Sequence, residues 1–145
     1  MPDTAQSVTH SVATISIDAA HRLIAAAEAK AAEMGVPMCI AVCDPGGNLV
    51  AFSRMDGAAL LSIKIAQDKA FTAVGFGMPT HGWHDFIKDD APLADGAPSG
   101  IDRLIIFGGG YPVSVDGATV GAIGVSGGHY TQDQEVAEAG LAALA

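Results

Sequence analysis

The chain has 145 residues, of which half are hydrophobic and 16% are charged, which is typical of a single globular domain and excludes a disordered chain. The net charge is −9 with only seven Lys and Arg residues. Nucleic acid and anionic membrane surfaces are therefore excluded as expected partners, because both are bound mainly through Lys and Arg. The apolar content of so small a chain predicts that some surface is buried between subunits of a homo-oligomer.

Neither a signal peptide nor a membrane span is expected, because the N-terminus lacks a basic and an apolar stretch and no apolar run is long enough. Cys39 and Cys43 lie four residues apart in one predicted strand, about 13 Å from each other, which is too far for a disulfide. Two unpaired core cysteines are typical of a reducing compartment. We expect a cytoplasmic protein.

Residues 1–15 are polar and lack periodicity, so we expect a flexible N-terminal arm followed by one domain over 16–145. Ser16 is a favourable N-cap for the first helix, and Gly35 is a favourable stop. The predicted elements are a helix over 16–34, strands over 38–43 and 49–54, a helix over 58–76, strands over 104–107, 111–115 and 118–125, and a helix over 131–143. Successive strands joined by short turns favour an α+β fold with an antiparallel sheet.

Glycine is concentrated between Phe107 and Tyr130, and Asp116-Gly117 within this stretch predicts a hairpin turn with positive φ at both positions. Residues 81–101 are the least regular part, with one short helical piece to about Lys88. A loop of this length is often a lid or a binding segment. The last helix is expected to start at Thr131, where the residues fit a capping box.

Cations are scarce, so Arg54, Lys69 and Arg103 are candidates for holding a carboxylate, with an ion pair to a nearby Asp or Glu as the equally weighted structural alternative. Lys69 lies on a very apolar helix, and its neighbour Asp68 does not share its face, so its partner must come from elsewhere. A covered lysine can also have a lowered pKa and move protons.

Three histidines are candidate ligands of a metal ion or a cofactor. His81 and His84 lie one helical turn apart among aspartates and form a candidate metal site, although such loops are more often simply solvated. His21 lies at the edge of an apolar helix face. It is either a structural histidine or an axial ligand of haem iron.

Several stretches together resemble the GlcG/HbpS family of haem-binding or haem-associated proteins, which is related to the C-terminal domain of PduO-type corrinoid adenosyltransferases. The stretches are VCDPGGNLV (42–50), RMDG (54–57), SIKIAQDKA (62–70), FGGGYP (107–112), GAIGVSGG (121–128) and QDQEVAEAGL (132–141). The resemblance implies a profilin-like fold, with a five-stranded antiparallel sheet flanked by helices, and a dimer or higher oligomer.

Three functions remain open. In the first, the protein binds haem or another tetrapyrrole, with His21 as the ligand implied by the resemblance; Arg103 and the backbone amides of Gly109, Gly110, Gly127 and Gly128 would hold the carboxylates. In the second, it is a small metal-independent enzyme of aromatic or organic-acid catabolism: a deaminase, isomerase or hydrolase of an unsaturated carboxylate. There Arg54 or Arg103 would clamp the substrate, and Lys69 or Asp44 would transfer protons. In the third, it is an assembly or sensor domain without a ligand.

Overall fold

The structure is a computed structural model that describes residues 7–145, so the part of the predicted arm over residues 1–6 lies outside the described residues. The described elements are α1 (Ile17–Met34), β1 (Cys39–Cys43), β2 (Leu49–Arg54), α2 (Ser62–Phe76), α3 (Gly82–Ile87), α4 (Ala91–Gly100), β3 (Gly110–Val115), β4 (Ala118–Ser126) and α5 (Tyr130–Ala142). The strands form one antiparallel sheet in the order β2-β1-β4-β3. The predicted α+β class is confirmed.

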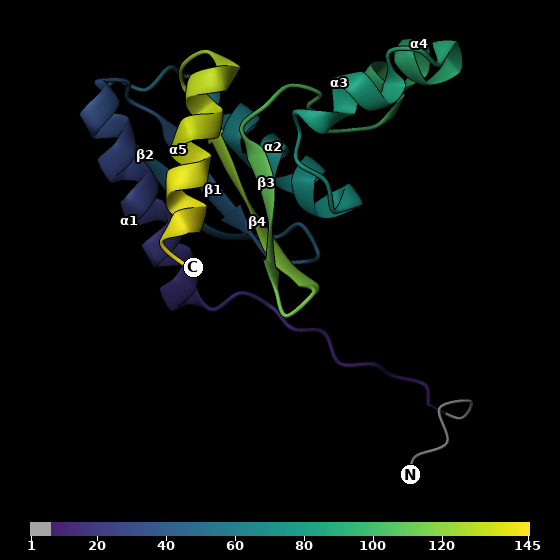
Figure 1. The fold of residues 1–145 in the computed structure, drawn as a ribbon, viewed down its shortest axis with the longest axis horizontal. Coiled ribbons are helices and arrows are strands. Elements are labelled where there is room, and N and C mark those ends of the chain that lie inside the picture. Colours follow the sequence, from purple (N-terminus) through teal and green to yellow (C-terminus); the bar gives the residue numbers. More distant parts are fainter. Residues whose placement is uncertain (1–6) are drawn as a thin grey trace.

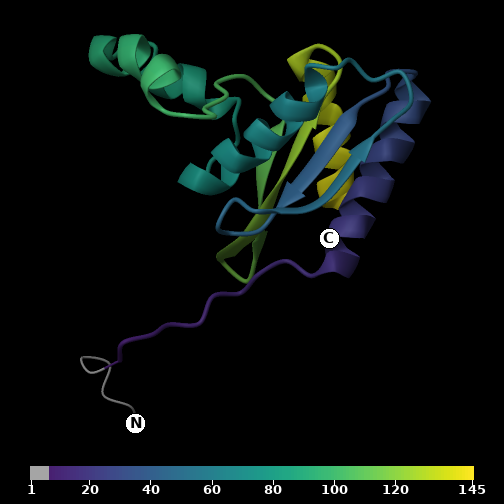
Figure 2. The same cartoon turned by 180° about the vertical axis from the view of Figure 1, so that it is seen from behind.

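Helices cover both faces of this sheet. α1 and α5 lie side by side on one face, and α2 crosses the other (Figures 1 and 2). The larger apolar core, which includes Leu23, Ile40 and Ile123, fills the space beneath α1 and α5. The core under α2 is built mostly from alanine and cysteine, which brings this helix close to the sheet. Cys39 and Cys43 are both free and buried there, as predicted.

The prediction of a fifth strand over 104–107 is wrong, and the described sheet has four strands. The backbone amide of Ile105 donates to Thr72 Oγ1 of α2, at 3.0 Å, instead of to a neighbouring strand. Leu104 and Ile106 pack against Trp83 and Ile87, outside the two cores at the sheet. The apolar pattern of this segment therefore reflects packing on a helix.

Residues 81–101 form two helices, α3 and α4, where the sequence predicted a mostly irregular loop with one helical piece. They project away from the sheet as a helical arm (Figure 1). α4 is capped by the Asp90 side chain, which accepts from the amide of Leu93 at 3.3 Å, and it contains Pro98. Its glycines and prolines concealed the helix, because they are the residues that normally interrupt one.

Some of the predicted helix ends and the predicted hairpin turn agree with the structure, whereas other helix ends differ. Ser16 caps α1, and Gly35 ends it with a φ of 72°. The hairpin turn has positive φ at both Asp116 and Gly117, as expected. α2, however, begins at residue 62 and not at 58, and α5 begins at residue 130.

The division into an arm over 1–15 and a domain over 16–145 stays a prediction. Residues 7–14 are exposed and lie outside the helices and strands, whereas Ile15 is buried and its amide donates to the carbonyl of Val120 at 2.9 Å. No helix in the range 7–145 combines the length and the apolar character that crossing a membrane requires.

Candidate functional site

Two adjoining cavities form a groove between the start of α3, the segment before β3 and the start of α5. One has a volume of about 390 Å³ and the other about 420 Å³, and both are lined by Phe107 and Tyr130. The first is also lined by His81, His84, Asp85, Ile106 and Gly108; the second is also lined by Ser62, Ile65, Ser126, Gly127, Gly128, His129 and Asp133. We call the two together the histidine groove.

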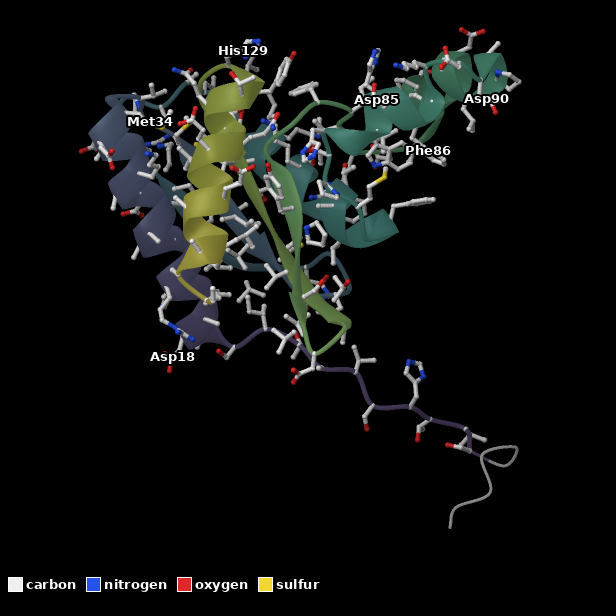
Figure 3. The ribbon with its side chains drawn as sticks, in the orientation of Figure 1. Asp18, Met34, Asp85, Phe86, Asp90 and His129 are labelled. Carbon is white, nitrogen blue, oxygen red and sulfur yellow. The ribbon has the colours of Figure 1, made fainter. Side chains whose placement is uncertain are left out.

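Three histidines at the starts of two helices line this groove. His81 precedes α3 and packs its ring against Tyr111, with 5.5 Å between the ring centroids. His129 caps α5, and its Nδ1 accepts from the amide of Thr131 at 3.3 Å. His84 is exposed, and its side chain makes no hydrogen bond to any residue that the structure describes. Figure 3 shows His129 at the start of α5, on the same edge of the molecule as Asp85.

A buried ion pair lies beneath the groove. Lys69 Nζ is 2.6 Å from Asp133 Oδ2 and donates to the carbonyl of Val125 at 2.8 Å. The other carboxylate oxygen of Asp133 accepts from the amide of Gly128 at 3.0 Å. The lysine side chain is fully buried, and its Nζ lies 5.2 Å from the centroid of the Phe107 ring. The pair links α2, β4 and α5 at one point.

Burial disfavours the charged form of both residues in this pair. Desolvation raises the pKa of Asp133, while the charge and hydrogen bond of Lys69 act in the opposite direction. Desolvation lowers the pKa of Lys69, and Asp133 raises it. Desolvation is the largest cause for both groups, so each charge depends on its partner to persist.

The predicted glycines divide into two pairs. Gly127 and Gly128 line the histidine groove. Gly109 and Gly110 are buried against α2: a Cβ at 109 would lie 2.6 Å from Lys69 Nζ, and one at 110 would lie 2.4 Å from the carbonyl oxygen of Lys69. Close packing against the helix explains Gly109 and Gly110 without a ligand.

Besides Gly109 and Gly110, four further predicted site residues lie outside the groove. His21 is exposed on α1, and Arg54 is exposed at the end of β2. Asp44 organises the turn between β1 and β2, where Oδ1 accepts from the amides of Gly46 and Asn48, each at 2.9 Å. Arg103 lines a separate pocket.

The structure brings Lys69, Gly127, Gly128, His81 and His84 together, and adds Phe107, His129, Tyr130 and Asp133. The sequence indicated that Lys69 needed a partner other than Asp68, but nothing identified Asp133, which is 64 residues away. Within the described chain no group of three or more His, Cys, Asp or Glu side chains could hold a metal ion. A metal site at His81 and His84 stays a prediction.

The sequence profile described as "Haem degrading protein HbpS-like" matches residues 15–142. The chain belongs to this family. Among curated relatives, an uncharacterised 15.0 kDa protein from the dhaT-dhaS intergenic region of Citrobacter freundii is 42% identical over 130 residues, 90% of this chain and 92% of that protein. Protein GlcG of Escherichia coli K12 is 39% identical over 112 residues, covering 77% and 81% of the two chains. The resemblance to the GlcG/HbpS family is confirmed.

The chain also matches the corrinoid adenosyltransferase PduO of Citrobacter freundii, with 34% identity over 90% of this chain but only 39% of that protein. Among solved structures, Klebsiella pneumoniae ORFY has a TM-score of 0.89 at 36% identity, with 95% of each chain covered. A PduOC:heme complex has a TM-score of 0.84 at 33% identity, covering 90% of this chain and 94% of that chain. Haem binding is thus found among the structural relatives of this chain.

Proposed function

We propose that this protein binds haem in the histidine groove. One observation carries the proposal: three imidazoles border a groove with an aromatic wall, in a chain whose relatives include a haem complex. Each of the two cavities has a volume within the usual range for organic cofactor sites. Imidazole is a common axial ligand of haem iron, and apolar side chains suit the faces of the macrocycle.

Residues of the groove fit the different parts of a haem. Phe107 and Tyr130 are 42% and 45% exposed and present apolar surface to a flat ring. The chemistry that haem supplies when bound is that of its iron, whose reactivity depends on the axial ligand and on nearby donors. The protein's own contribution is to orient the ring, to supply an imidazole and to limit the access of water.

His84 is the favoured iron ligand. His129 already uses Nδ1 to cap α5, and His81 packs on Tyr111, whereas His84 makes no hydrogen bond to a described residue. This replaces His21 as the first choice, because none of the described cavities is lined by His21. Of the two histidines that the sequence predicted as metal ligands, His84 would thus bind the haem iron and His81 would lie near the haem.

Titration with hemin tests the proposal. We expect the wild-type protein to shift the Soret band of hemin, and His84→Ala to weaken binding about tenfold or more, which is the usual loss when a metal ligand or its support is removed. His21→Ala is the matched control, since it removes an exposed helical histidine away from the groove, and it should bind as the wild type does.

The titration also has clear contrary outcomes. No Soret shift with wild-type protein would remove haem binding itself. A loss on His21→Ala with none on His84→Ala would keep haem but move it out of the groove. Circular dichroism of each variant confirms that the fold is retained.

The relatives and solved structures described above do not support the alternative of a metal-independent catabolic enzyme. Arg54 and Asp44, which this alternative requires for substrate binding and proton transfer, do not share a site. Arg54 is exposed at the end of β2, and Asp44 holds the turn between β1 and β2. The profilin-like description of the fold, homo-oligomer formation and the cytoplasmic location stay predictions. Exposed apolar residues such as Leu60 and Leu61, at 78% and 75% exposure, are in keeping with a subunit interface.

A further inference from the structure

A polar pocket of about 240 Å³ lies apart from the histidine groove, and the pocket and the groove share no lining residue. It is formed by the end of β1, the turn before β2, one side of α2 and the segment after α4. The lining residues are Ala41, Cys43, Gly47, Asn48, Leu49, Gln67, Ala70 and Arg103. We call it the Arg103 pocket.

Its lining is positively charged in a chain that is otherwise strongly acidic. Arg103 is the charged residue in the lining, which includes neither Asp nor Glu. The carboxylate of Asp68, outside the lining, accepts from Arg103 Nε at 2.8 Å and also pairs with Lys64. Two cations thus share one carboxylate. Since only Nε of Arg103 contacts Asp68, the terminal nitrogens of the guanidinium remain for another anion.

The arginine is held firmly in place. Its guanidinium carbon lies 4.0 Å from the centroid of the Phe71 ring. Its backbone has a φ of 64°, which is uncommon for a residue other than glycine, and its carbonyl accepts from Thr72 Oγ1 at 2.8 Å. Such strain persists only where the surroundings enforce it, and it is concentrated at ligand sites.

The backbone around the pocket is also adapted to this arrangement. Gly47 has a φ of 82°, and a Cβ there would lie 2.7 Å from Cδ2 of Phe71. A side chain at 47 would therefore displace the ring on which Arg103 packs. Glycine at this position keeps both the turn and the position of the arginine.

Neutral polar groups complete the lining. Gln67 Nε2 donates to the carbonyl of Ile63 at 2.9 Å, which fixes the amide and leaves Oε1 as an acceptor. Asn48 contributes a second amide, whose Nδ2 donates to both oxygens of the Asp44 carboxylate, each at 3.3 Å, and whose Oδ1 is left as an acceptor. Burial raises the pKa of the Cys43 thiol to about 11, so the thiol stays neutral and adds no negative charge. One fixed cation beside two amides is suited to a carboxylate that carries a further polar group.

We propose that the Arg103 pocket is a binding site for a small organic carboxylate, separate from the haem site. The carboxylate would receive two parallel hydrogen bonds from the terminal nitrogens of Arg103, and the amide oxygens of Asn48 and Gln67 would accept from a hydroxyl group. The volume is below the usual range for larger cofactors, so the ligand has only a few carbon atoms.

The test is NMR titration of the ¹⁵N-labelled full chain with acetate, glycolate, malonate and succinate, each at constant ionic strength. At least one is expected to shift the amides of Gly47, Asn48 and Arg103, and to leave those of Gly127 and Gly128 unchanged. Arg103→Gln should weaken the binding at least tenfold, and Arg103→Lys should weaken it less, because lysine keeps the charge without the bidentate geometry. Arg54→Gln, which removes an exposed arginine elsewhere, should have no effect.

Asn48→Ala gives a second measure in case Arg103→Gln unfolds, because it leaves the buried Asp68 contacts intact; a several-fold weaker binding is expected. The proposal is overturned if no acid in the series shifts the pocket amides, if inorganic phosphate binds more tightly than every carboxylate, or if Arg54→Gln weakens binding as much as Arg103→Gln. Hemin titration of Arg103→Gln is expected to match the wild type, which separates this site from the groove.

Discussion

Replacing Lys69 by methionine is expected to lower the free energy of unfolding by about 3–5 kcal/mol, because it leaves the Asp133 carboxylate buried without its partner. Asp133 is only 2% exposed, so bulk solvent does not replace the lost cation. Methionine fills much of the same volume, so the loss reports the charge more than a cavity. Urea unfolding followed by circular dichroism measures the change.

Two further variants check that cause. Lys88→Met removes a lysine of similar length from an exposed pair with Asp85, at 3.3 Å, and should cost less than about 1 kcal/mol. The double variant Lys69→Met with Asp133→Leu removes both buried charges and should recover much of the stability, since apolar pairs often replace buried ion pairs at little cost. A wild-type-like Lys69→Met would show that the pair contributes little.

Stability of Lys69→Met should also depend on pH. Desolvation already raises the pKa of Asp133, and removing Lys69 takes away the influences that lower it. The folded variant then binds a proton at a higher pH than the unfolded chain, so its stability falls as the pH rises through the folded pKa. Its deficit relative to the wild type should shrink as the pH is lowered toward the ordinary pKa of an aspartate. A deficit independent of pH would contradict this account.

Gly124→Ala is expected to destabilise the protein by about 3 kcal/mol or more, because β4 and α2 are in close contact at this residue. A Cβ there would lie 2.0 Å from the carbonyl oxygen of Ala66 and 2.5 Å from the amide nitrogen of Ala70. Both are backbone atoms of a helix, so neither can move without shifting α2. Thermal unfolding of the purified variant measures the effect.

Gly75→Ala is the matched control for that variant. It makes the same chemical change inside α2, where an added Cβ would meet nothing within 4 Å. It should stabilise the protein by about 0.5–1 kcal/mol, since alanine favours the helix over glycine. Equal effects of the two substitutions would mean that the β4 contact yields more readily than its geometry suggests.

The sequence predicted the parts of the site that have a local cause. Lys69 stood out because a lysine on an apolar helix needs a partner, and Gly127 and Gly128 stood out because they precede a helix. His81 and His84 were recognised from their spacing. His21, Arg54 and Asp44 were equally plausible by residue type, but they lie outside the groove.

Local signals also account for most of the fold. Ser16, Gly35 and the turn at Asp116-Gly117 act within a few residues, so their patterns predicted the ends of elements correctly. The prediction of a fifth strand over 104–107 was wrong because apolar residues follow the same pattern whether they pack on a sheet or on a helix. α4 was missed because its capping residue Asp90 outweighs an unfavourable composition.

By itself, the sequence determined the family, the α+β class and most of the helices and strands, because these depend on periodicity, caps and turns that neighbouring residues define. Only the tertiary structure decided which side chains share a site. Asp133 meets Lys69 across 64 residues, and Phe107 and Tyr130 join two cavities into one groove. It also placed Arg103 in a pocket of its own. Such contacts arise from the packing of helices on the sheet, which leaves no periodic pattern along the chain.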